Sequence, residues 1–272
     1  MPELPEVELA RRCLLSWIGK APLDRVWASP GKPLRHATPG QVVSALKGRR
    51  TLGVERIGKH LLWKLDRDVA VHLHLGMTGK LVLRDPGDAP PAHERVGFEA
   101  GGHTIHFVDP RRFGRFELVS AGKLRELPDG EALGPDALDE PQGGPALAAR
   151  LGATRRPLKV ALMDQALIAG LGNIQVAEAL FRARLSPALT PAKVSPAQWR
   201  RLSTAIRQSL QQTLSTERPG SGRDIAYVEE PGSDNPFRVY GHAGEPCPRC
   251  KTPIRRVVQA QRSTFYCPRC QR

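Results

Sequence analysis

The sequence contains no apolar run that approaches the roughly 20 residues of a membrane-spanning helix. Its first residues also lack the basic and then apolar order of a signal peptide. No internal repeat and no low-complexity tract interrupts the 272 residues. We therefore expect a cytoplasmic protein that has no membrane partner.

Acidic residues are scarce in the C-terminal half. Residues 150–223 contain 12 Lys and Arg but 3 Asp and Glu, and residues 247–272 contain 7 basic residues and no acidic ones. Residues 1–149 are nearly balanced, with 21 basic and 19 acidic residues. This clustering of the net charge of +14 favours a polyanion partner, most economically nucleic acid, and hence a nucleoid-associated protein. A solvated basic face without a partner is the alternative.

Length and composition indicate a globular protein of two domains. The hydrophobic fraction of 40% and the charged fraction of 25% are ordinary, and 272 residues supply a core for each domain. Residues 128–147 are rich in Gly, Pro, Asp and Ala, which predicts a hinge there.

Four of the five cysteines have metal-ligand spacing. Cys247, Cys250, Cys267 and Cys270 form the pattern C-x2-C-x16-C-x2-C. Two such knuckles on a short hairpin suit one tetrahedral, structural zinc ion, whereas two disulfides are the weaker alternative in a cytoplasmic chain. Cys13 stands alone in an amphipathic segment, where we expect a small core residue.

Hydrophobic periodicity predicts a change of structure along the chain. Apolar residues recur at helical spacing near the N-terminus and again after the hinge, and short strands separated by Gly and Pro turns lie between them as a sandwich or barrel. A mobile loop is expected at 84–94, where three prolines and a glycine occur. The predicted helices are 5–18, 158–167, 174–182 and 197–214, and the predicted strands are 61–65, 69–75, 80–83, 103–108 and 115–119.

The first eight residues, MPELPEVE, are the most unusual stretch. If Met1 is removed, Pro2 becomes a free secondary amine beside the carboxylate of Glu3. An α-amino group is far less protonated near neutrality than lysine, and its attack on an aldehyde-like carbon gives an iminium ion. The alternative is that the prolines stiffen a helix start and the later glutamates favour its positive end.

Two glycine-containing turns carry side chains that could contact DNA. In Asp109–Gly114 two arginines and Phe113 stand on a Pro- and Gly-bounded turn, which suits a wedge that enters a base stack beside an arginine that contacts a base edge. Residues 74–79 place Met77 on a glycine turn, although core filler is the better explanation for Met77 alone.

Other motifs carry weaker signals. The turn Gly170–Asn173 precedes a helix whose free N–H groups suit an anion, and a simple helix cap explains it equally well. Lys59 before a strand is ordinarily a solvated lysine. His72 and His74 have no recognisable metal-ligand motif near them in the sequence. We therefore expect them to be hydrogen-bonded structural residues or residues that face a phosphate.

Taken together, these motifs resemble the formamidopyrimidine-DNA glycosylase family over essentially the whole chain. They occur in the order found in that family. They are Pro2–Glu8, Gly58-Lys59, His74–Gly79, Asp109–Gly114, Leu162–Asp164, Leu171–Ile174, Tyr240-Gly241, Gly244–Cys247, Gln261-Arg262 and Phe265–Cys267.

The resemblance implies an α+β multidomain fold with one structural zinc ion. Residues 1–130 would form an N-terminal helix and β-sandwich, residues 131–222 a helix–two-turn–helix domain, and residues 223–272 a lesion-side loop and zinc finger. It also implies a monomeric enzyme that acts on damaged double-stranded DNA, removes oxidised or ring-opened purines and then cleaves the abasic site by β,δ-elimination.

Individual roles follow only where this sequence matches the family motifs. Pro2 would be the nucleophile at C1′ and Glu3 the acid/base, with Glu6 as active-site support. Lys59, Asn173 and Arg262 would hold the phosphates around the flipped nucleotide. We expect Lys59 and Arg262 to be catalytic residues as well. The trio that fills the vacated stack would be Met77, Arg111 and Phe113, and Lys159 is a looser DNA-binding candidate beside the lesion.

Two departures from the family pattern affect base recognition. Gln175 stands where relatives usually have Tyr, and the loop 219–223 lacks their Ser/Thr-rich run. An endonuclease VIII-like enzyme for oxidised pyrimidines is one alternative, but that branch typically has Gly at the position of Leu4 and lacks the Asp109–Gly114 motif. A non-catalytic zinc-ribbon protein that binds damaged DNA is the other, and it would leave Pro2 and Glu3 unexplained.

Overall fold

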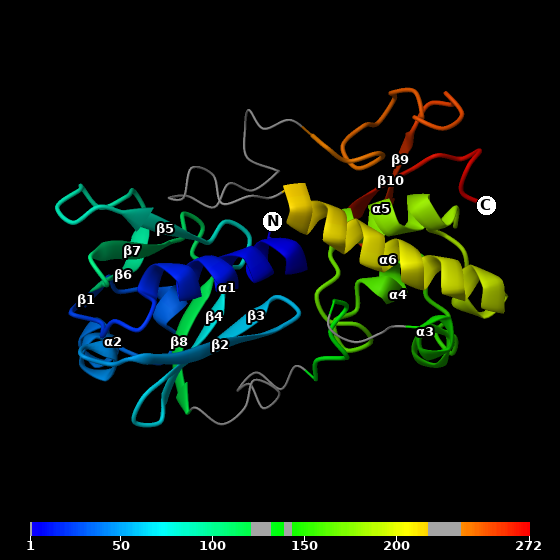
Figure 1. Cartoon of the computed structure of the whole chain (residues 1–272). Helices are drawn as coiled ribbons and strands as arrows, with labels where there is room; N and C mark the ends of the chain where they lie inside the picture. The colour runs from blue at the N-terminus through cyan, green and yellow to red at the C-terminus, as the bar shows by residue number, and fades with distance from the viewer. Residues whose placement is uncertain (1, 121–131, 139–142, 217–234) are drawn as a thin grey trace. The chain divides into compact units, whose positions relative to one another are not determined.

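The computed structural model describes residues 2–120, 132–138, 143–216 and 235–272 (Figure 1). The chain divides into two compact units, one of residues 1–130 with 217–230 and one of residues 131–216 with 231–272. The predicted domain boundaries at 130/131 and 222/223, and the loop 219–223, lie outside the described residues.

The first unit contains two antiparallel four-stranded sheets, one in the order β1-β6-β7-β5 and the other in the order β2-β3-β4-β8. The strands are β1 (Arg25–Ala28), β2 (Thr51–Ile57), β3 (His60–Leu65), β4 (Val69–His74), β5 (Lys80–Arg84), β6 (Glu94–Ala100), β7 (His103–Val108) and β8 (Arg115–Ser120). The expected β-sandwich is therefore present. Residues 85–93, within the predicted loop, connect β5 and β6 without a helix or strand.

Large apolar side chains from both sheets fill the sandwich, among them the fully buried Trp63, Phe98, Phe107 and Phe116. Each such side chain stabilises the fold by roughly 1.5–3 kcal/mol. Helix α1 (Leu4–Ile18) contacts strands of both sheets. It continues the core through an apolar stripe that includes the buried Cys13, as predicted. A second helix, α2 (Pro39–Leu46), packs against β1.

The second unit is helical and carries a small hairpin. Its helices are α3 (Gly144–Leu151), α4 (Leu158–Leu162), α5 (Asn173–Ala183) and α6 (Pro196–Thr216), and its strands are β9 (Arg255–Gln259) and β10 (Arg262–Tyr266). Helix α5 packs along α6, and β10 contacts α5 (Figure 1). The hairpin is thereby attached to the central helix of this unit.

The structure corrects two sequence predictions. The helix predicted at 158–167 ends at Leu162, because the Asp164 carboxylate accepts the Ala166 N–H at 2.9 Å and so stabilises a turn. The predicted hinge at 128–147 is too long, since α3 begins at Gly144. Within the described residues, no helix is long and apolar enough to cross a bilayer.

Candidate active site and zinc centre

The N-terminal helix begins with a capping box. Glu3 is the N-cap residue, its backbone N–H donates to Glu6 Oε2 at 2.9 Å, and the Glu3 side chain accepts from the Glu6 backbone. Pro5 lies in the first turn, where proline is favoured. The helix-start interpretation therefore explains Pro5 and Glu6. It leaves Pro2 unexplained, because Pro2 precedes the cap and makes no helical turn.

A buried ion-pair cluster fixes α1 to the second sheet. Arg56 Nε lies 3.0 Å from Glu8 Oε2, and both side chains are almost fully buried. Arg11 and Arg12 also bind Glu8, at 2.9 and 2.8 Å. Burial raises the pKa of Glu8, but the hydrogen bonds from the three arginines outweigh it and hold the pKa at about 2. Glu8 is therefore ionised throughout the physiological range.

Arg56 also contacts the turn that carries Lys59. Arg56 Nη1 donates to the carbonyl of Gly58 at 3.3 Å. Gly58, with φ of 56°, and Lys59 form the two-residue turn between β2 and β3, a position that favours glycine. One buried arginine thus connects the helix that follows Pro2 with the turn that carries Lys59.

Met77 and Phe113 lie on two turns joined by a buried carboxylate. Asp109 accepts Thr78 Oγ1 at 2.9 Å through one oxygen and the Gly114 N–H at 2.7 Å through the other. Both hydrophobic side chains are exposed, Met77 to 39% and Phe113 to 53%. The core-filler interpretation of Met77 is therefore wrong.

The two turns also touch through their backbones. Gly76 has a φ of 63°, and a Cβ at this position would lie 2.6 Å from the carbonyl carbon of Phe113. Arg111 lies over the Phe113 ring, with its guanidinium carbon 4.9 Å from the ring centroid. Met77, Arg111 and Phe113 are therefore held on one compact surface, which we call the wedge.

A row of histidines supports the wedge from within the second sheet. His74 Nδ1 accepts the Gly76 N–H at 3.0 Å, and the His60 and His72 rings meet at 3.0 Å between Nδ1 and Nε2. His72 in turn lies 3.6 Å from Glu117. Burial, followed by the neighbouring histidines and cations, lowers the pKa of His60 to about 2, and the same factors lower the pKa of His74 to about 3. These two side chains are therefore neutral near pH 7.

In the second unit, Asn173 is the first residue of α5 and is 9% exposed. Its Oδ1 atom is buried and has no hydrogen-bond partner among the described residues. The preceding turn is held by Gln165, which donates to Leu171 O and accepts from Gly170 N, both at 2.9 Å. The turn thus places Asn173 at the N-terminus of a helix, whose free backbone N–H groups favour an anion.

Lys159 is almost completely buried and connects α4 with the hairpin. Its Nζ atom donates to Ser263 O at 2.9 Å and to Thr264 Oγ1 at 2.6 Å. Arg262, the first residue of β10 and exposed, directly precedes these contacts. Lys159 therefore supports the strand that carries Arg262.

Glu178 on α5 attaches the segment before the finger. Its carboxylate accepts the backbone N–H groups of Arg238, Val239 and Tyr240 at 2.9–3.1 Å. Three donors on one buried carboxylate fix this segment against the helix.

The four cysteines of the hairpin form a zinc site. Their sulfur atoms all lie within 4.8 Å of one another, at 3.9 Å for Cys247 and Cys270 and 3.4 Å for Cys250 and Cys267. Tetrahedral zinc with Zn–S bonds of about 2.3 Å needs sulfur separations of about 3.8 Å, so the donor set fits the ion. None of the cysteines forms a disulfide.

The surroundings shift two of the thiol pKa values in opposite directions. Hydrogen bonds from Thr252 lower the pKa of Cys250 to about 6, whereas burial and then the neighbouring thiols raise the pKa of Cys270 to about 12. Four adjacent thiolates repel one another unless a dication compensates them.

Three family models match successive parts of the chain. They describe the formamidopyrimidine-DNA glycosylase N-terminal domain at residues 1–116, the H2TH domain of the same enzymes at 133–224, and a zinc finger found in FPG and IleRS at 244–272.

Similar proteins cover the chain from end to end. A formamidopyrimidine-DNA glycosylase of Thermus thermophilus is 41% identical over 278 residues, which span 100% of this chain and 98% of the relative. One of Symbiobacterium thermophilum is 39% identical over 279 residues, spanning 100% of this chain and 89% of the relative. The chain belongs to the formamidopyrimidine-DNA glycosylase family.

Solved structures of formamidopyrimidine-DNA glycosylases share the fold. The Lactococcus lactis Fpg in complex with DNA containing an abasic site matches with a TM-score of 0.89 and 27% identity, and each chain is covered completely. The MutM (Fpg) protein of Thermus thermophilus matches with a TM-score of 0.82 and 38% identity, over 99% of this chain and 98% of that one. The N-terminal helix with its β-sandwich, the H2TH domain and the zinc finger are those of the family.

Gln175, the departure from the usual family Tyr, lies inside the helix pair. It is 1% exposed, donates to Thr213 at 2.9 Å and accepts from Ser209 at 2.8 Å, both on α6. In this formamidopyrimidine-DNA glycosylase family member, Gln175 therefore joins α5 to α6.

Sequence reasoning missed several supporting residues of this site. Arg56, Asp109, Gln165 and Glu178 are buried or partly buried polar groups whose partners lie elsewhere in the chain or on adjacent turns. Asp109 had one available signal, its place at the start of the Asp109–Gly114 motif. The other three stand in segments whose apolar pattern gives no sign of a polar contact.

Proposed function

We propose that this chain is a monomeric DNA glycosylase and abasic-site lyase that removes oxidised or ring-opened purines from duplex DNA in the cytoplasm, at the nucleoid. The observation that carries the proposal is the position of Pro2. It lies outside the capped helix, directly before Glu3, and the helix that follows it is fixed to the Lys59 turn through Glu8 and Arg56.

In the proposed reaction, the Pro2 amine, free once Met1 is removed, attacks C1′ of the damaged nucleotide. The bond from C1′ to the base breaks, and the base leaves with a proton. Glu3 donates a proton to the ring oxygen as the sugar opens, and the secondary amine becomes an iminium ion. The iminium acidifies C2′, so that loss of a C2′ proton expels the 3′ phosphate and a second elimination expels the 5′ phosphate.

The remaining site residues hold the DNA in this proposal. Lys59, Asn173 and Arg262 bind phosphates around the extruded nucleotide, and Lys159 positions the strand of Arg262. The wedge fills the vacated stack and offsets part of the unstacking cost of a few kcal/mol. We also propose the division into residues 1–130, 131–222 and 223–272, which the three matching family models support.

Borohydride trapping tests the nucleophile. Duplexes with 8-oxoguanine opposite cytosine, or with an abasic site, should each form a covalent adduct with the protein. Pro2→Gly replaces the secondary amine by a weaker primary-amine nucleophile and should reduce the amount of adduct. Retention of Met1 should abolish the adduct. Pro5→Ala is the matched control, because Pro5 lies in the first helical turn, and it should keep the adduct.

Other outcomes would favour other functions. Binding to both duplexes without an adduct or strand cleavage would leave only a damaged-DNA-binding protein. Preferential excision of oxidised pyrimidines would indicate the endonuclease VIII-like activity. An adduct that survives retention of Met1 would contradict Pro2 as the nucleophile.

A further inference from the structure

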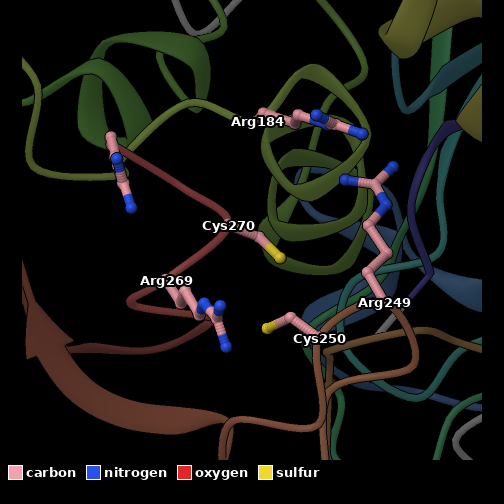
Figure 2. Close-up of a pocket in the computed structure, with 6 residues that line it drawn as sticks. Arg184, Arg249, Cys250, Arg269 and Cys270 are labelled. Carbon is pink, nitrogen blue, oxygen red and sulfur yellow. The ribbon is translucent and has the colours of Figure 1, made fainter.

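A cationic hollow lies beside the zinc site, at the end of the hairpin away from Arg262. It has a volume of about 660 Å³ and is lined by Arg184, Arg249, Arg269, Arg272 and the two half-buried cysteines of the site, Cys250 and Cys270. Figure 2 shows the two cysteine sulfur atoms facing each other, with Arg184 and Arg249 on one side and Arg269 on the other. Among the described residues, no Asp or Glu side chain lines this hollow.

Three of its four guanidinium groups have no partner within the described part of the chain. Arg249 is engaged, since it donates to Phe181 O at 2.6 Å and lies over the Phe181 ring. The side chains of Arg184, Arg269 and Arg272 are exposed and make no hydrogen bond or ion pair with a described residue. Arginines elsewhere are commonly paired, for example with Glu8, Glu99 and Asp164.

The charge of the hollow is not cancelled by the zinc centre. Four thiolates and one Zn²⁺ carry a formal charge of about −2. Four guanidinium groups line the hollow beside them, so positive charge remains for an external anion. Planar guanidinium forks bind carboxylates in a bidentate manner. The forks here come from three segments, which are the end of α5, the Cys247–Cys250 turn and the segment after β10 that contains both Arg269 and Arg272.

Shape and position separate this hollow from the DNA-contacting residues. Its volume is that of a typical small-ligand pocket, about 300–1,000 Å³, whereas a rigid duplex is a convex cylinder that would touch only the rim. The hollow also adjoins Cys250 and Cys270 of the zinc site, and five residues of extended strand, about 17 Å, separate Arg262 from Cys267, another ligand of that site.

We propose that the hollow formed by Arg184, Arg249, Arg269 and Arg272 is a docking site for an acidic peptide segment of a partner protein. Side chains of Asp or Glu on a flexible segment enter the hollow and pair with the unpartnered guanidinium forks. This site is independent of the reaction at Pro2. It gives the zinc finger a second task, which is to attach the protein to a partner while the hairpin turn remains available for DNA.

The test uses the full-length, zinc-loaded protein and a short fluorescein-labelled peptide rich in Asp, followed by fluorescence anisotropy. The same peptide with Asn in place of Asp is the uncharged control. Arg184→Glu combined with Arg269→Glu should weaken binding of the Asp peptide by at least about tenfold. Arg200→Glu combined with Arg207→Glu, on exposed positions of α6, makes the same charge change outside the hollow and should leave most of the affinity.

Zinc content and excision of 8-oxoguanine should be unchanged in the hollow variant, which shows that the finger is folded. Equal losses in both double variants, or equal binding of the Asn peptide, would overturn the proposal. If undamaged duplex displaces the Asp peptide and the hollow variant loses duplex affinity to the same extent, the hollow is a DNA contact and the peptide proposal fails. It fails equally if inorganic phosphate at low concentration displaces the peptide completely, because the hollow is then a small-anion site.

Discussion

At the scale of single residues, Glu8 has the largest expected effect on stability. Glu8→Gln leaves Arg56 buried without its counter-ion, which typically costs about 3–5 kcal/mol. We expect a loss of about 3 kcal/mol in the free energy of unfolding, measured by urea denaturation. The control is Glu55→Gln, which removes a largely exposed partner of Lys64 and should cost less than about 1 kcal/mol.

Glu8 also predicts a dependence of stability on acid. Its pKa is lowered from 4.5 to about 2 in the folded protein, so its contribution is complete above pH 4.5 and is lost as the pH falls towards 2. The free energy of unfolding of the Glu8→Gln variant should therefore change less across this window than that of the unaltered protein. Parallel curves for the two proteins would show that Glu8 is not held in its charged form.

Phe113 provides a test of the wedge. Phe113→Ala should weaken binding to a lesion-containing duplex by about 1–3 kcal/mol, the usual value of a stacking aromatic, and should affect binding to undamaged duplex less. Leu52→Ala is the matched control, because Leu52 is a 70% exposed apolar side chain on β2 outside the wedge. Equal effects of Phe113→Ala on both duplexes, measured by competition binding, would remove the proposed wedge role.

At the scale of secondary-structure elements, the histidine row makes the second sheet sensitive to acid. The folded pKa of His60 is about 2, far below its ordinary value of 6.5, because of burial and of the neighbouring His74, His72, Arg115 and Lys59. The stability that neutral His60 contributes is complete above pH 6.5 and declines as the pH falls below it.

We therefore expect His60→Phe to reduce the loss of thermal stability that occurs as the pH falls below 6.5. His36→Phe, at an exposed position of the same unit, should leave that loss unchanged. Circular-dichroism melting curves at several pH values measure both. A His60→Phe protein that loses as much stability as the unaltered one would show that this histidine is not buried in its neutral form.

Helices with a long apolar periodicity could be predicted from the sequence. A helix end that is set by side-chain contacts could not. The helices near 5–18, 174–182 and 197–214 carry long apolar stripes, and the structure confirms them as α1, α5 and α6. The segment 158–167 has similar apolar spacing, but Asp164 and Gln165 bind local backbone groups and end the helix. Such competition depends on the surrounding turn, which no periodicity reveals.

At the scale of the whole molecule, zinc should connect the finger with DNA binding. Cys267→Ser removes one of four ligands, so we expect loss of zinc and of the hairpin contacts that Lys159 makes at Ser263 and Thr264. Affinity for an abasic duplex should fall, while the Pro2 adduct should still form at saturating protein. Cys13→Ala, at the core cysteine outside the zinc site, should retain one zinc ion per chain by metal analysis.

Motifs predicted which residues matter at this scale, and the fold explains what holds them. The cysteine spacing alone was enough to predict the zinc site, because two Cys-x2-Cys turns on one short hairpin supply the four ligands of a tetrahedral ion. The resemblance named the wedge residues, but what holds them together required the structure, since Gly76 and Phe113 are far apart in sequence and meet through backbone atoms. Sequence also gave no sign of the hollow, whose four arginines come from the end of α5, two knuckles and the last residue.

The close approach of Gly76 to Phe113 has a kinetic consequence. The turns of Met77 and Phe113 share a backbone contact and the Asp109 carboxylate, so neither can advance or withdraw alone without breaking both. In the wedge role proposed above, we therefore expect insertion into a base stack to be a single concerted step. A fluorescent base analogue beside the lesion should report one exponential phase for unstacking, with no species in which only one of the two side chains has entered.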